Sequence, residues 1–341
     1  MPSFVLILRS QIQLATVCVS NILIFRVWVG IGIQDFKAME NRLAFIMSPR
    51  LGDSIIAMVV VYNLHLQGYQ CVVYSKFLVM LKEWFPWCDI RPIPDAETAQ
   101  REWPEFTMLL HTYPHDVLYD ARLWHPQVKV LADNPLHNSR VINMVDTQLL
   151  MLREEFGIEN PERSNGIQAP AGCSLRKNYF RVVLHPTAAM KVRYWLPNRY
   201  IVLANKLRKL GFHPVFITTE SERAATAWIE KAGFERACFA TMGQVAQFLY
   251  ESGWFVGSDS GLGHLASCMG IPTVSLHQRA KVRKRWRPGF APNEGLIACV
   301  NLIYKPWKER FWKYFITVGM VVRAFKSLVK RCHGVYPIHR K

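Results

Sequence analysis

The stretch WFVGSDSGLGHLASCMGIPTVSL (254–276) contains one complete structural unit. Its apolar run 254–258 predicts a strand, 261–269 predicts a helix, and 273–276 predicts a second strand. A strand, a helix and a strand in this order form the repeating unit of a parallel sheet. The stretch therefore predicts an α/β fold.

The turn between the first strand and the helix has the features of an anion-binding site. Gly261 and Gly263 lack a Cβ atom, so a ligand can approach the backbone there. The N–H groups of the first helical turn and the helix dipole favour negative charge, which predicts a seat for a nucleotide pyrophosphate. The alternative is an ordinary turn in which Asp259 or Ser260 caps the helix.

The same alternation extends outward over most of the chain. The segment 157–174 is rich in Pro, Gly, Asn and Ser, and is the best candidate for a linker. We predict two Rossmann-like domains, 41–165 and 170–303, whose parallel sheets face a central cleft. Strands are predicted at 43–47, 71–74, 89–93, 106–111, 181–185 and 213–218, and helices at 54–67, 76–84, 138–156, 198–210, 221–232 and 243–251.

The two ends of the chain depart from this pattern. Residues 1–40 form an apolar extension, but Arg and Gln residues interrupt it too often for a clean membrane span. An interfacial anchor, an extra helix, or translated sequence upstream of the true start at Met39 all remain open. The tail 304–341 mixes Trp and Phe with Lys and Arg, which suits either an interfacial helix on anionic lipid or a helix that bridges the domains.

The composition favours an anionic partner. The chain carries 42 Lys and Arg against 25 Asp and Glu, a formal net charge of +17. No recognised nucleic-acid-binding module accompanies this charge, so we expect no nucleic-acid partner. The eight cysteines lack metal-ligand spacing and are expected to be reduced thiols. The motifs D-x-D, HExxH, GxGxxG and the Walker phosphate loop are absent, so we expect no bound metal or cofactor.

A second motif is RVVLHPTAAMKVRYWLP (181–197), in which a predicted strand ends before a hydroxyl and two cations. Thr187, Lys191 and Arg193 could bind phosphates and stabilise the charge that develops on a departing nucleotide diphosphate. The alternative is a solvated loop with surface cations.

A third motif is MSPRLGDSIIA (47–57), where Gly52 permits a tight turn and Asp53 lies at a helix start. The helix dipole favours the ionised form of Asp53 there. An ionised carboxylate that faces a cleft can take the proton of an attacking hydroxyl group. The alternative is a helix N-cap.

Together these motifs resemble glycosyltransferase family 9, the ADP-heptose:lipopolysaccharide heptosyltransferases, over roughly residues 42–300. That family has a G-D turn after its first strand, a lysine followed closely by W-P, and a late D-[ST]-G-L-x-H-L-A stretch. Here they are similar to GD (52–53), KVRYWLP (191–197) and DSGLGHLA (259–266), while RWRPGF (285–290) resembles another late segment of the family.

The resemblance implies a GT-B fold and an inverting, metal-independent enzyme. It would move a heptose or related sugar from an ADP-sugar co-substrate to a lipopolysaccharide core or other cell-envelope acceptor. Asp53 matches the general base, and Thr187 with a nearby cation, Lys191 or Arg193, matches the diphosphate contacts. The remaining donor contacts would be Glu222, Met242, Asp259, Ser260, Gly261, Leu262 and His264, and contacts to acceptor phosphates or to the diphosphate would come from Arg50, Arg285 and Arg287.

The sequence departs from the family in the second motif. The family lysine stands two residues before the Trp, which is followed directly by Pro. Here Arg193 holds that position, Lys191 lies two residues earlier, and Leu196 separates Trp195 from Pro197. Which cation meets the diphosphate is therefore open, because Arg and Lys are not interchangeable where geometry matters.

The resemblance also implies a cytoplasmic protein in peripheral contact with an anionic inner membrane. Three alternatives stay open: a transferase of the same fold that acts on a protein or another glycan with a different nucleotide sugar, a sugar epimerase of that fold, and a catalytically silent, membrane-associated binding protein.

Overall fold

The computed structural model describes residues 41–113, 121–138, 142–298 and 305–332. These residues belong to one compact unit, Met39–Lys341. The predicted apolar extension 1–40 lies outside the described residues, as does part of the predicted tail.

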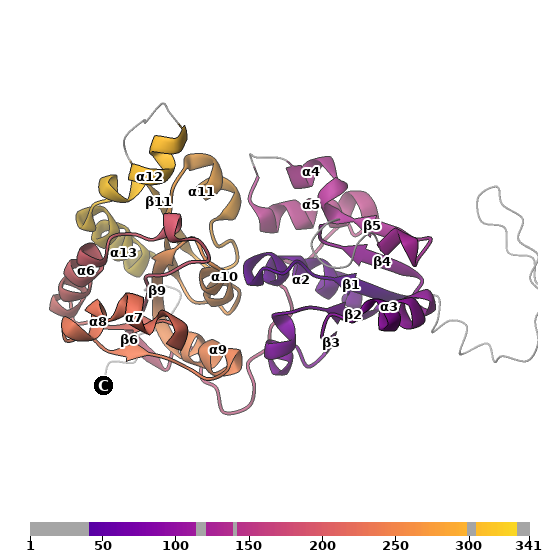
Figure 1. Ribbon diagram of the computed structural model, residues 1–341, viewed down its shortest axis with the longest axis horizontal. Helices are drawn as coiled ribbons and strands as arrows, with labels where there is room; N and C mark the ends of the chain where they lie inside the picture. The colour runs from indigo at the N-terminus through magenta and orange to yellow at the C-terminus, as the bar shows by residue number, and fades with distance from the viewer. Residues whose placement is uncertain (1–40, 114–120, 139–141, 299–304, 333–341) are drawn as a thin grey trace, which may run out of the picture. The chain divides into compact units, whose positions relative to one another are not determined.

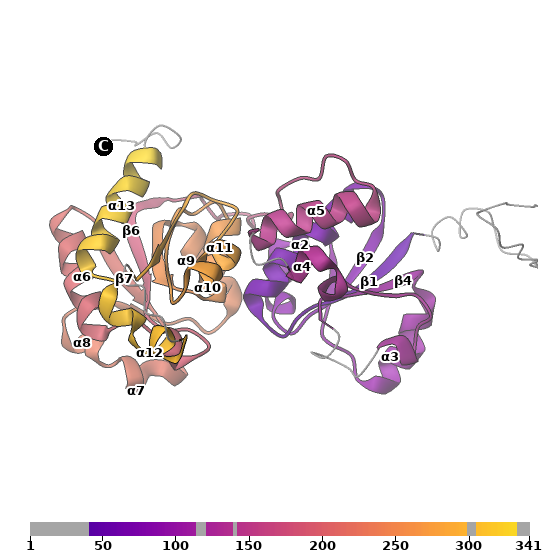
Figure 2. The same ribbon diagram turned by 90° about the horizontal axis from the view of Figure 1, so that it is seen from above.

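The first sheet has five strands, all parallel, in the order β3-β2-β1-β4-β5. Alternate side chains of its central strand enter two cores: Leu43 and Phe45 pack with α2, while Ala44 and Ile46 pack with residues around α3. Figure 2 shows α2 and α5 on one face of this sheet and α3 on the other. The bounds are β1 (Arg42–Ile46), β2 (Gln70–Tyr74), β3 (Asp89–Arg91), β4 (Met108–His111), β5 (Val128–Val130), α2 (Leu51–Leu66), α3 (Ala96–Glu102) and α5 (Met144–Phe156).

The second sheet has six parallel strands in the order β11-β10-β9-β6-β7-β8. Val182 and Leu184 of β6 share a core with α6 and α13, whereas Val183 packs into the opposite core with Phe255. Burial on both faces explains why these strands read as continuous apolar runs. The bounds are β6 (Asn178–His185), β7 (His213–Ile217), β8 (Arg236–Ala237), β9 (Ser252–Ser258), β10 (Thr273–His277), β11 (Asn293–Ile297), α6 (Pro197–Lys209), α9 (Met242–Tyr250), α10 (Gly261–Cys268) and α13 (Val318–Cys332).

The predicted α/β class with two parallel sheets is confirmed, and the differences concern short elements. The helix predicted at 138–156 begins only at Met144, because Asn143 caps it through its side chain. The helix predicted at 221–232 is divided into three short pieces, and strands β5, β8 and β11 and helices α3 and α11 were not predicted. The remaining elements are η1 (Leu78–Trp84), η2 (Trp103–Glu105), η3 (Ala121–Leu123), η4 (Leu131–Asp133), α4 (Pro135–Asn138), η5 (Lys191–Arg193), η6 (Glu220–Glu222), α7 (Arg223–Thr226), α8 (Trp228–Lys231), α11 (Ala280–Trp286) and α12 (Lys305–Phe315).

The predicted linker contains neither helix nor strand, but it is fastened to α2. The side chain of Asn63 donates to the carbonyl of Glu162 (2.9 Å) and accepts from its amide (2.7 Å). Asn165, which is buried, donates to the carbonyl of Ile55. Helix α2 therefore satisfies some of the hydrogen-bonding groups of the linker backbone. These bonds fix the path of the linker along the helix. The domain boundaries drawn from this segment stay a prediction.

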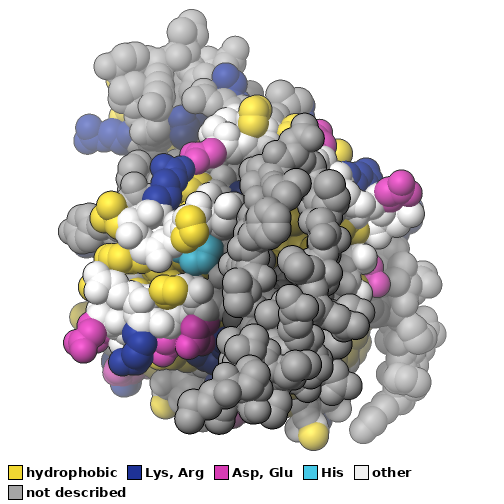
Figure 3. All heavy atoms as spheres, turned by 90° about the vertical axis from the view of Figure 1, so that its right-hand side faces the viewer, with side chains coloured by type: hydrophobic (Ala, Val, Ile, Leu, Met, Phe, Trp, Pro, Cys, Tyr) yellow, Lys and Arg dark blue, Asp and Glu magenta, His cyan; other side chains and the backbone are white. Residues whose placement is uncertain are grey.

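Figure 3 looks onto the side of the molecule that lies at the right of Figure 1. On its coloured atoms, basic and acidic side chains are interspersed with single hydrophobic ones. Among the described helices, none has the length and apolar character needed to cross a membrane.

Candidate active site

The strand order of the second sheet brings two distant loops together. The chain leaves β6 toward β7 on one side, and it later returns to add β9 on the other side. Ligands bind in α/β sheets at the carboxyl ends of the strands where the order reverses in this way. His185, the last residue of β6, pairs in register with Gly257 of β9. The loops after residues 185 and 258 therefore meet at this point.

His185 connects two of the loop residues, Thr187 and Ser260. Its Nδ1 lies 3.1 Å from Ser260 Oγ, and its Nε2 lies 3.1 Å from Thr187 Oγ1. Burial lowers the pKa of His185 to about 4, against a smaller opposite effect of Glu222. The ring is therefore neutral near pH 7, with one nitrogen as donor and the other as acceptor. Thr187 and Ser260 were predicted site residues; His185 was not.

This bridge changes the role of Ser260. Ser260 is the N-cap residue of α10, yet its side chain makes no capping hydrogen bond, because its hydroxyl group pairs with His185. Ser260 therefore holds the N-cap position, but the side-chain capping bond of the alternative is absent. The amides of Gly261 and Leu262 lie in the first turn, where no intrahelical acceptor exists. They remain available to an anion.

Asp259 and Arg193 form an ion pair across the same loops. Arg193 Nη1 lies 3.2 Å from Asp259 Oδ2, and the side chains are 34% and 13% exposed. Burial raises the pKa of Asp259 to about 6, and the positive charge of Arg193 opposes that rise. Lys191 is exposed, and its side chain makes no hydrogen bond or ion pair within the described part of the chain. Of the two predicted cations, the structure brings Arg193 to the loop.

Two more buried histidines lie beside this pair. Burial lowers the pKa of His264 to about 4. The pKa of His277 is lowered to about 3, mainly by burial and then by His264 and the positive charges of Arg283, Arg193 and Arg287. The Nδ1 atom of each ring is buried without a hydrogen-bond partner among the described residues. His277 and Arg283 were not predicted as site residues. For His185 and His277 a signal existed, because each ends a strand of a parallel sheet.

Asp53 lies in the first turn of α2, as predicted. The N-cap of that helix is Arg50, so the alternative that Asp53 is the N-cap is wrong. Asp53 Oδ2 lies 3.5 Å from Ser48 Oγ, which donates to it, and 3.8 Å from Arg50 Nη1. The carboxylate is 13% exposed, and the helix dipole favours its ionised form.

The beginnings of α2 and α10 approach each other closely because both carry glycine. A Cβ atom on Gly261 would lie 3.0 Å from Leu51 Cβ and 3.2 Å from the amide nitrogen of Gly52. A Cβ atom on Gly52 would lie 3.0 Å from the ring of His264. Real Cβ atoms rarely come so close to neighbouring atoms, so any larger residue at either position would have to displace its neighbour. The turn that carries Asp53 therefore lies against the loop of Asp259 and Ser260.

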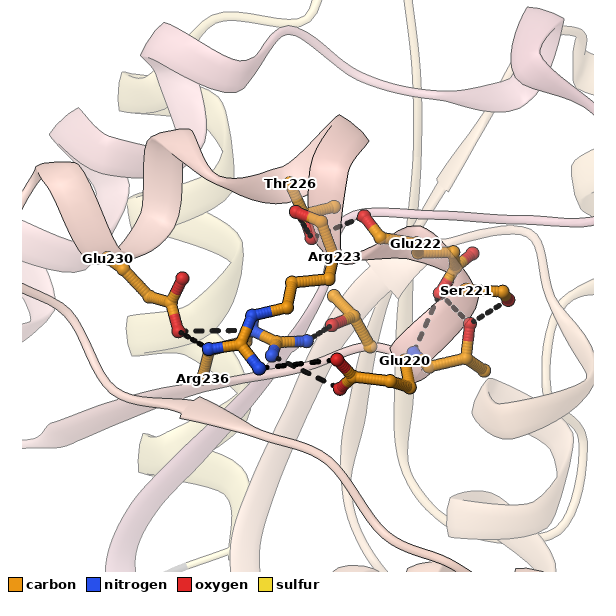
Figure 4. Close-up of polar contacts among 9 residues, drawn as sticks. Glu220, Ser221, Glu222, Arg223, Thr226, Glu230 and Arg236 are labelled. Carbon is orange, nitrogen blue, oxygen red and sulfur yellow. Dashed lines mark hydrogen bonds and ion pairs between the residues drawn. The ribbon is translucent and has the colours of Figure 1, made fainter.

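Of the other predicted donor contacts, Glu222 lies near the site and Met242 packs against the hydrophobic core. The carboxylate of Glu222 accepts hydrogen bonds from the amide and the hydroxyl group of Thr219, both at 2.9 Å. Its charge reaches His185, whose pKa it raises, so it lies near the site. Figure 4 also shows Arg236 between two other glutamates, in a network that fixes this turn. Met242 begins α9 and packs against the hydrophobic core, as Leu262 does from α10.

The three arginines predicted as phosphate contacts are dispersed. Arg50 is 73% exposed. The guanidinium of Arg285 donates to the carbonyl of His137 on α4. Arg287 is exposed and lines a cavity of about 190 Å³ together with Arg163. Over the described ranges, His, Cys, Asp and Glu side chains nowhere gather in threes that could hold a metal ion.

Comparison with known proteins now places this geometry in a family. The model of glycosyltransferase family 9 (heptosyltransferase) matches residues 114–305, more than half of the chain. The fold is similar to that of E. coli ADP-heptose lps heptosyltransferase II (14% identity, 85% of this chain and 99% of that chain covered, TM-score 0.63). It is also similar to a family 9 glycosyl transferase from Veillonella parvula (14%, 85% and 97%, 0.64) and to E. coli heptosyltransferase WaaC with ADP-2-deoxy-2-fluoro heptose (12%, 84% and 99%, 0.57).

No curated protein matches the sequence. The family match covers the loops of Arg193, Asp259 and Ser260, and the similarity to E. coli heptosyltransferase II covers 85% of the chain. The chain belongs to glycosyltransferase family 9, and it is a glycosyltransferase with the GT-B fold.

Proposed function

We propose that this enzyme transfers a heptose or related sugar from an ADP-sugar to a lipopolysaccharide core or other cell-envelope acceptor, with inversion and without a metal ion. One observation carries the donor side of the proposal. The hydroxyl group of Ser260 is bound to His185, which leaves the first-turn amides of α10 to an anion, and Arg193 lies beside them. A nucleotide diphosphate has the charge that such a site favours.

The buried imidazoles support the same assignment. The Nδ1 atoms of His264 and His277 have no partner among the described residues, and an unpaired buried polar group is costly. Phosphate or sugar oxygens would supply hydrogen bonds to them. Arg283 and Arg287 add positive charge near His277. The choice of ADP and heptose rests on the family and on the names of the similar structures.

The acceptor side of the proposal rests on Asp53. Its position one residue after Gly52 places it on the turn that touches the donor loop. In the proposed reaction an acceptor hydroxyl oxygen attacks the anomeric carbon, and its proton passes to Asp53. The bond from that carbon to the diphosphate oxygen breaks. The negative charge left on the diphosphate is stabilised by Arg193 and by the amides of Gly261 and Leu262.

The proposal includes a location at the cytoplasmic face of the inner membrane, where acceptors of this class are anchored. The basic and aromatic composition of the tail after residue 304 supports it. Metal independence is proposed from the absence of a D-x-D motif in the sequence.

Isothermal titration of the chain with ADP, UDP, GDP and CMP, with and without EDTA, tests the donor assignment. We expect preferential binding of ADP that EDTA leaves unchanged. The variants Arg193→Gln and Ser260→Ala should weaken ADP binding, because each disturbs the proposed diphosphate site. Arg323→Gln, which removes an exposed arginine from α13, is the matched control and should bind ADP normally.

Each outcome of the titration decides something. Preferential binding of another nucleotide would leave the family assignment unchanged and would overturn the assignment of an ADP-sugar as the donor. Loss of binding in EDTA would overturn metal independence. Once ADP binding is established, the anomeric configuration of the transferred sugar, read by NMR, tests inversion.

A further inference from the structure

Helix α12 is held in place at its carboxyl end by the segment that follows Arg193. Arg199 donates to the carbonyls of Lys313 (3.0 Å), Tyr314 (2.8 Å) and Ile316 (2.5 Å). Trp195 Nε1 donates to the carbonyl of Ile316 as well (3.0 Å). The last carbonyls of a helix have no intrahelical partner, so these bonds satisfy them and fix the helix.

The inner face of α12 also supports the loop of Arg193. Trp312 is buried, and its Nε1 donates to the carbonyl of Val192 at 3.0 Å. Gln278 donates to the same carbonyl at 2.8 Å. Two donors on one carbonyl of η5 fix the backbone one residue before Arg193. The helix and the proposed donor site are thus directly connected.

The outer face of α12 is aromatic and exposed. Trp307, Phe311 and Tyr314 follow one another at helical spacing and are 57%, 39% and 50% exposed. Arg310 lies over the ring of Phe311 (5.7 Å), and Lys313 lies over the ring of Tyr314 (5.9 Å). Large aromatic side chains grouped on a surface, with cations beside them, are typical of helices that lie in a membrane interface.

The adjoining turn η5 has the same character. Met190 and Val192 are 48% and 42% exposed, and Lys191 between them is exposed as well. The bond from Trp312 to Val192 shows that this turn adjoins α12. We call the outer face of α12 together with residues 190–192 the α12 surface.

The charge of this region selects the partner. The sequence of α12, 305–315, contains four Lys and Arg residues and one acidic residue, Glu309. Anionic lipid attracts such a segment, and aromatic side chains insert at the level of the headgroups. A basic protein surface would be repelled, and a neutral one would gain no electrostatic attraction. Charge and aromatic content together therefore favour an anionic bilayer.

We propose that the α12 surface docks the enzyme on an anionic lipid bilayer, with Phe311 and Tyr314 inserted among the headgroups and Arg310 and Lys313 paired with lipid phosphates. This inference rests on the proposed function in one respect: a lipid-anchored acceptor would then meet the donor site beside the docked surface. Lys191, which is exposed and has no role in the resting ion pair, contacts lipid phosphates at the edge of this surface.

Flotation of the full-length chain with vesicles tests the docking. Wild type should bind vesicles of phosphatidylglycerol and phosphatidylethanolamine, bind phosphatidylcholine vesicles weakly, and lose binding at high salt. Phe311→Ser/Tyr314→Ser and Arg310→Glu/Lys313→Glu should each weaken binding by about tenfold or more. Residues 1–40 are the same in every variant, so differences between variants report the α12 surface.

Two double variants serve as controls. Leu66→Ser/Leu123→Ser removes exposed apolar side chains from the first domain, and Arg323→Glu/Lys326→Glu reverses two exposed charges on α13. Both should bind vesicles within about threefold of wild type. A loss in the α13 variant as large as in the α12 charge variant would show that total charge acts rather than this surface, and would overturn the proposal.

Further measurements separate the remaining outcomes. ADP titration of each variant confirms folding and keeps the two proposals distinguishable. Vesicle binding without ADP binding would overturn only the proposed donor site. ADP binding without vesicle binding would overturn only the proposed docking. Light scattering tests whether the α12 surface binds a second copy of the chain instead of lipid. If the α12 substitutions dissociate an oligomer and leave vesicle binding unchanged, the proposal is wrong.

Discussion

The guanidinium of Arg193 lies 3.2 Å from the carboxylate of Asp259 and joins the loop after β6 to the loop after β9. Burial favours the neutral form of Asp259 and raises its pKa to about 6, while Arg193 stabilises the ionised form. Near pH 7 both groups are therefore charged. In the proposed reaction, a donor diphosphate that enters this loop would meet Arg193 already positioned, and would compete with Asp259 for it.

This pair predicts unequal effects for the two cations of the second motif. Arg193→Gln should lower kcat/KM for the donor by roughly a hundredfold to a thousandfold, because a preorganised contact to the leaving group is lost. Lys191→Gln should lower it by less than about tenfold, since its side chain is exposed and unpaired in the described structure. Steady-state kinetics with varied donor measure both. A larger loss for Lys191→Gln would assign the leaving-group contact to Lys191.

Asp53→Asn should separate catalysis from donor binding. The amide keeps the shape of the side chain but cannot accept the proton of the attacking hydroxyl group, so kcat should fall by about two to four orders of magnitude. ADP affinity, measured by titration, should stay within about twofold. Asp89→Asn, at the start of β3, is a matched control and should retain activity. Near-normal turnover of Asp53→Asn would remove Asp53 from the role of base.

Stability should decrease on acidification below about pH 6.5. The pKa values of His185 and His264 are lowered from 6.5 to about 4 and that of His277 to about 3, so folding keeps these rings neutral while the unfolded chain protonates them. Their contribution is present above pH 6.5 and is lost as the pH falls through about 4. Asp259 acts in the opposite direction: its contribution is present below its ordinary pKa of 3.8 and is lost as the pH rises through about 6.

His137 adds to this loss, because burial and then the charge of Arg285 lower its pKa to about 4. Four histidines against Asp259 leave a net excess of three protons on the unfolded chain near pH 5. The free energy of unfolding should therefore fall by up to roughly 4 kcal/mol for each pH unit of acidification there, an upper bound from about 1.4 kcal/mol per proton. Urea unfolding from about pH 7 to about pH 5 measures the slope. His277→Asn should flatten it, whereas His213→Gln, at an exposed position, should not. An unchanged slope in His277→Asn would show that this ring does not resist protonation.

Gly261→Ala tests the close approach of α2 and α10. The new Cβ atom would lie 3.0 Å from Leu51 Cβ, which forces the two helix starts apart and should destabilise the fold by about 1–3 kcal/mol. Activity should fall further than stability, because Asp53 moves away from the donor loop. Gly243→Ala, on α9 with its nearest neighbour at 3.9 Å, is the control and should be neutral or stabilising. Full activity of Gly261→Ala would show that the approach is not needed.

Local patterns in the sequence were sufficient to predict the fold class. Apolar runs with helical stretches between them predict parallel strands wherever burial on both faces makes the runs continuous, as in β1, β6 and β9. The strands β5, β8 and β11 were not predicted. Strands β5 and β8 have only three and two residues, and β11 is only partly buried, so none of them gives a periodic hydrophobic signal. The loop 259–264 and the turn of Asp53 could be predicted as site candidates, because a glycine or an acidic residue at the start of a helix favours close backbone approach or a negative charge there.

What the sequence by itself determined is therefore the set of loops and the residue types within them. Only the tertiary structure decided their partners: Arg193 rather than Lys191 beside Asp259, and His185 rather than the helix amides as the partner of Ser260. It also directed Arg285 to a backbone carbonyl. The reason is that strand order, which no local pattern encodes, sets residues 75 positions apart at hydrogen-bonding distance.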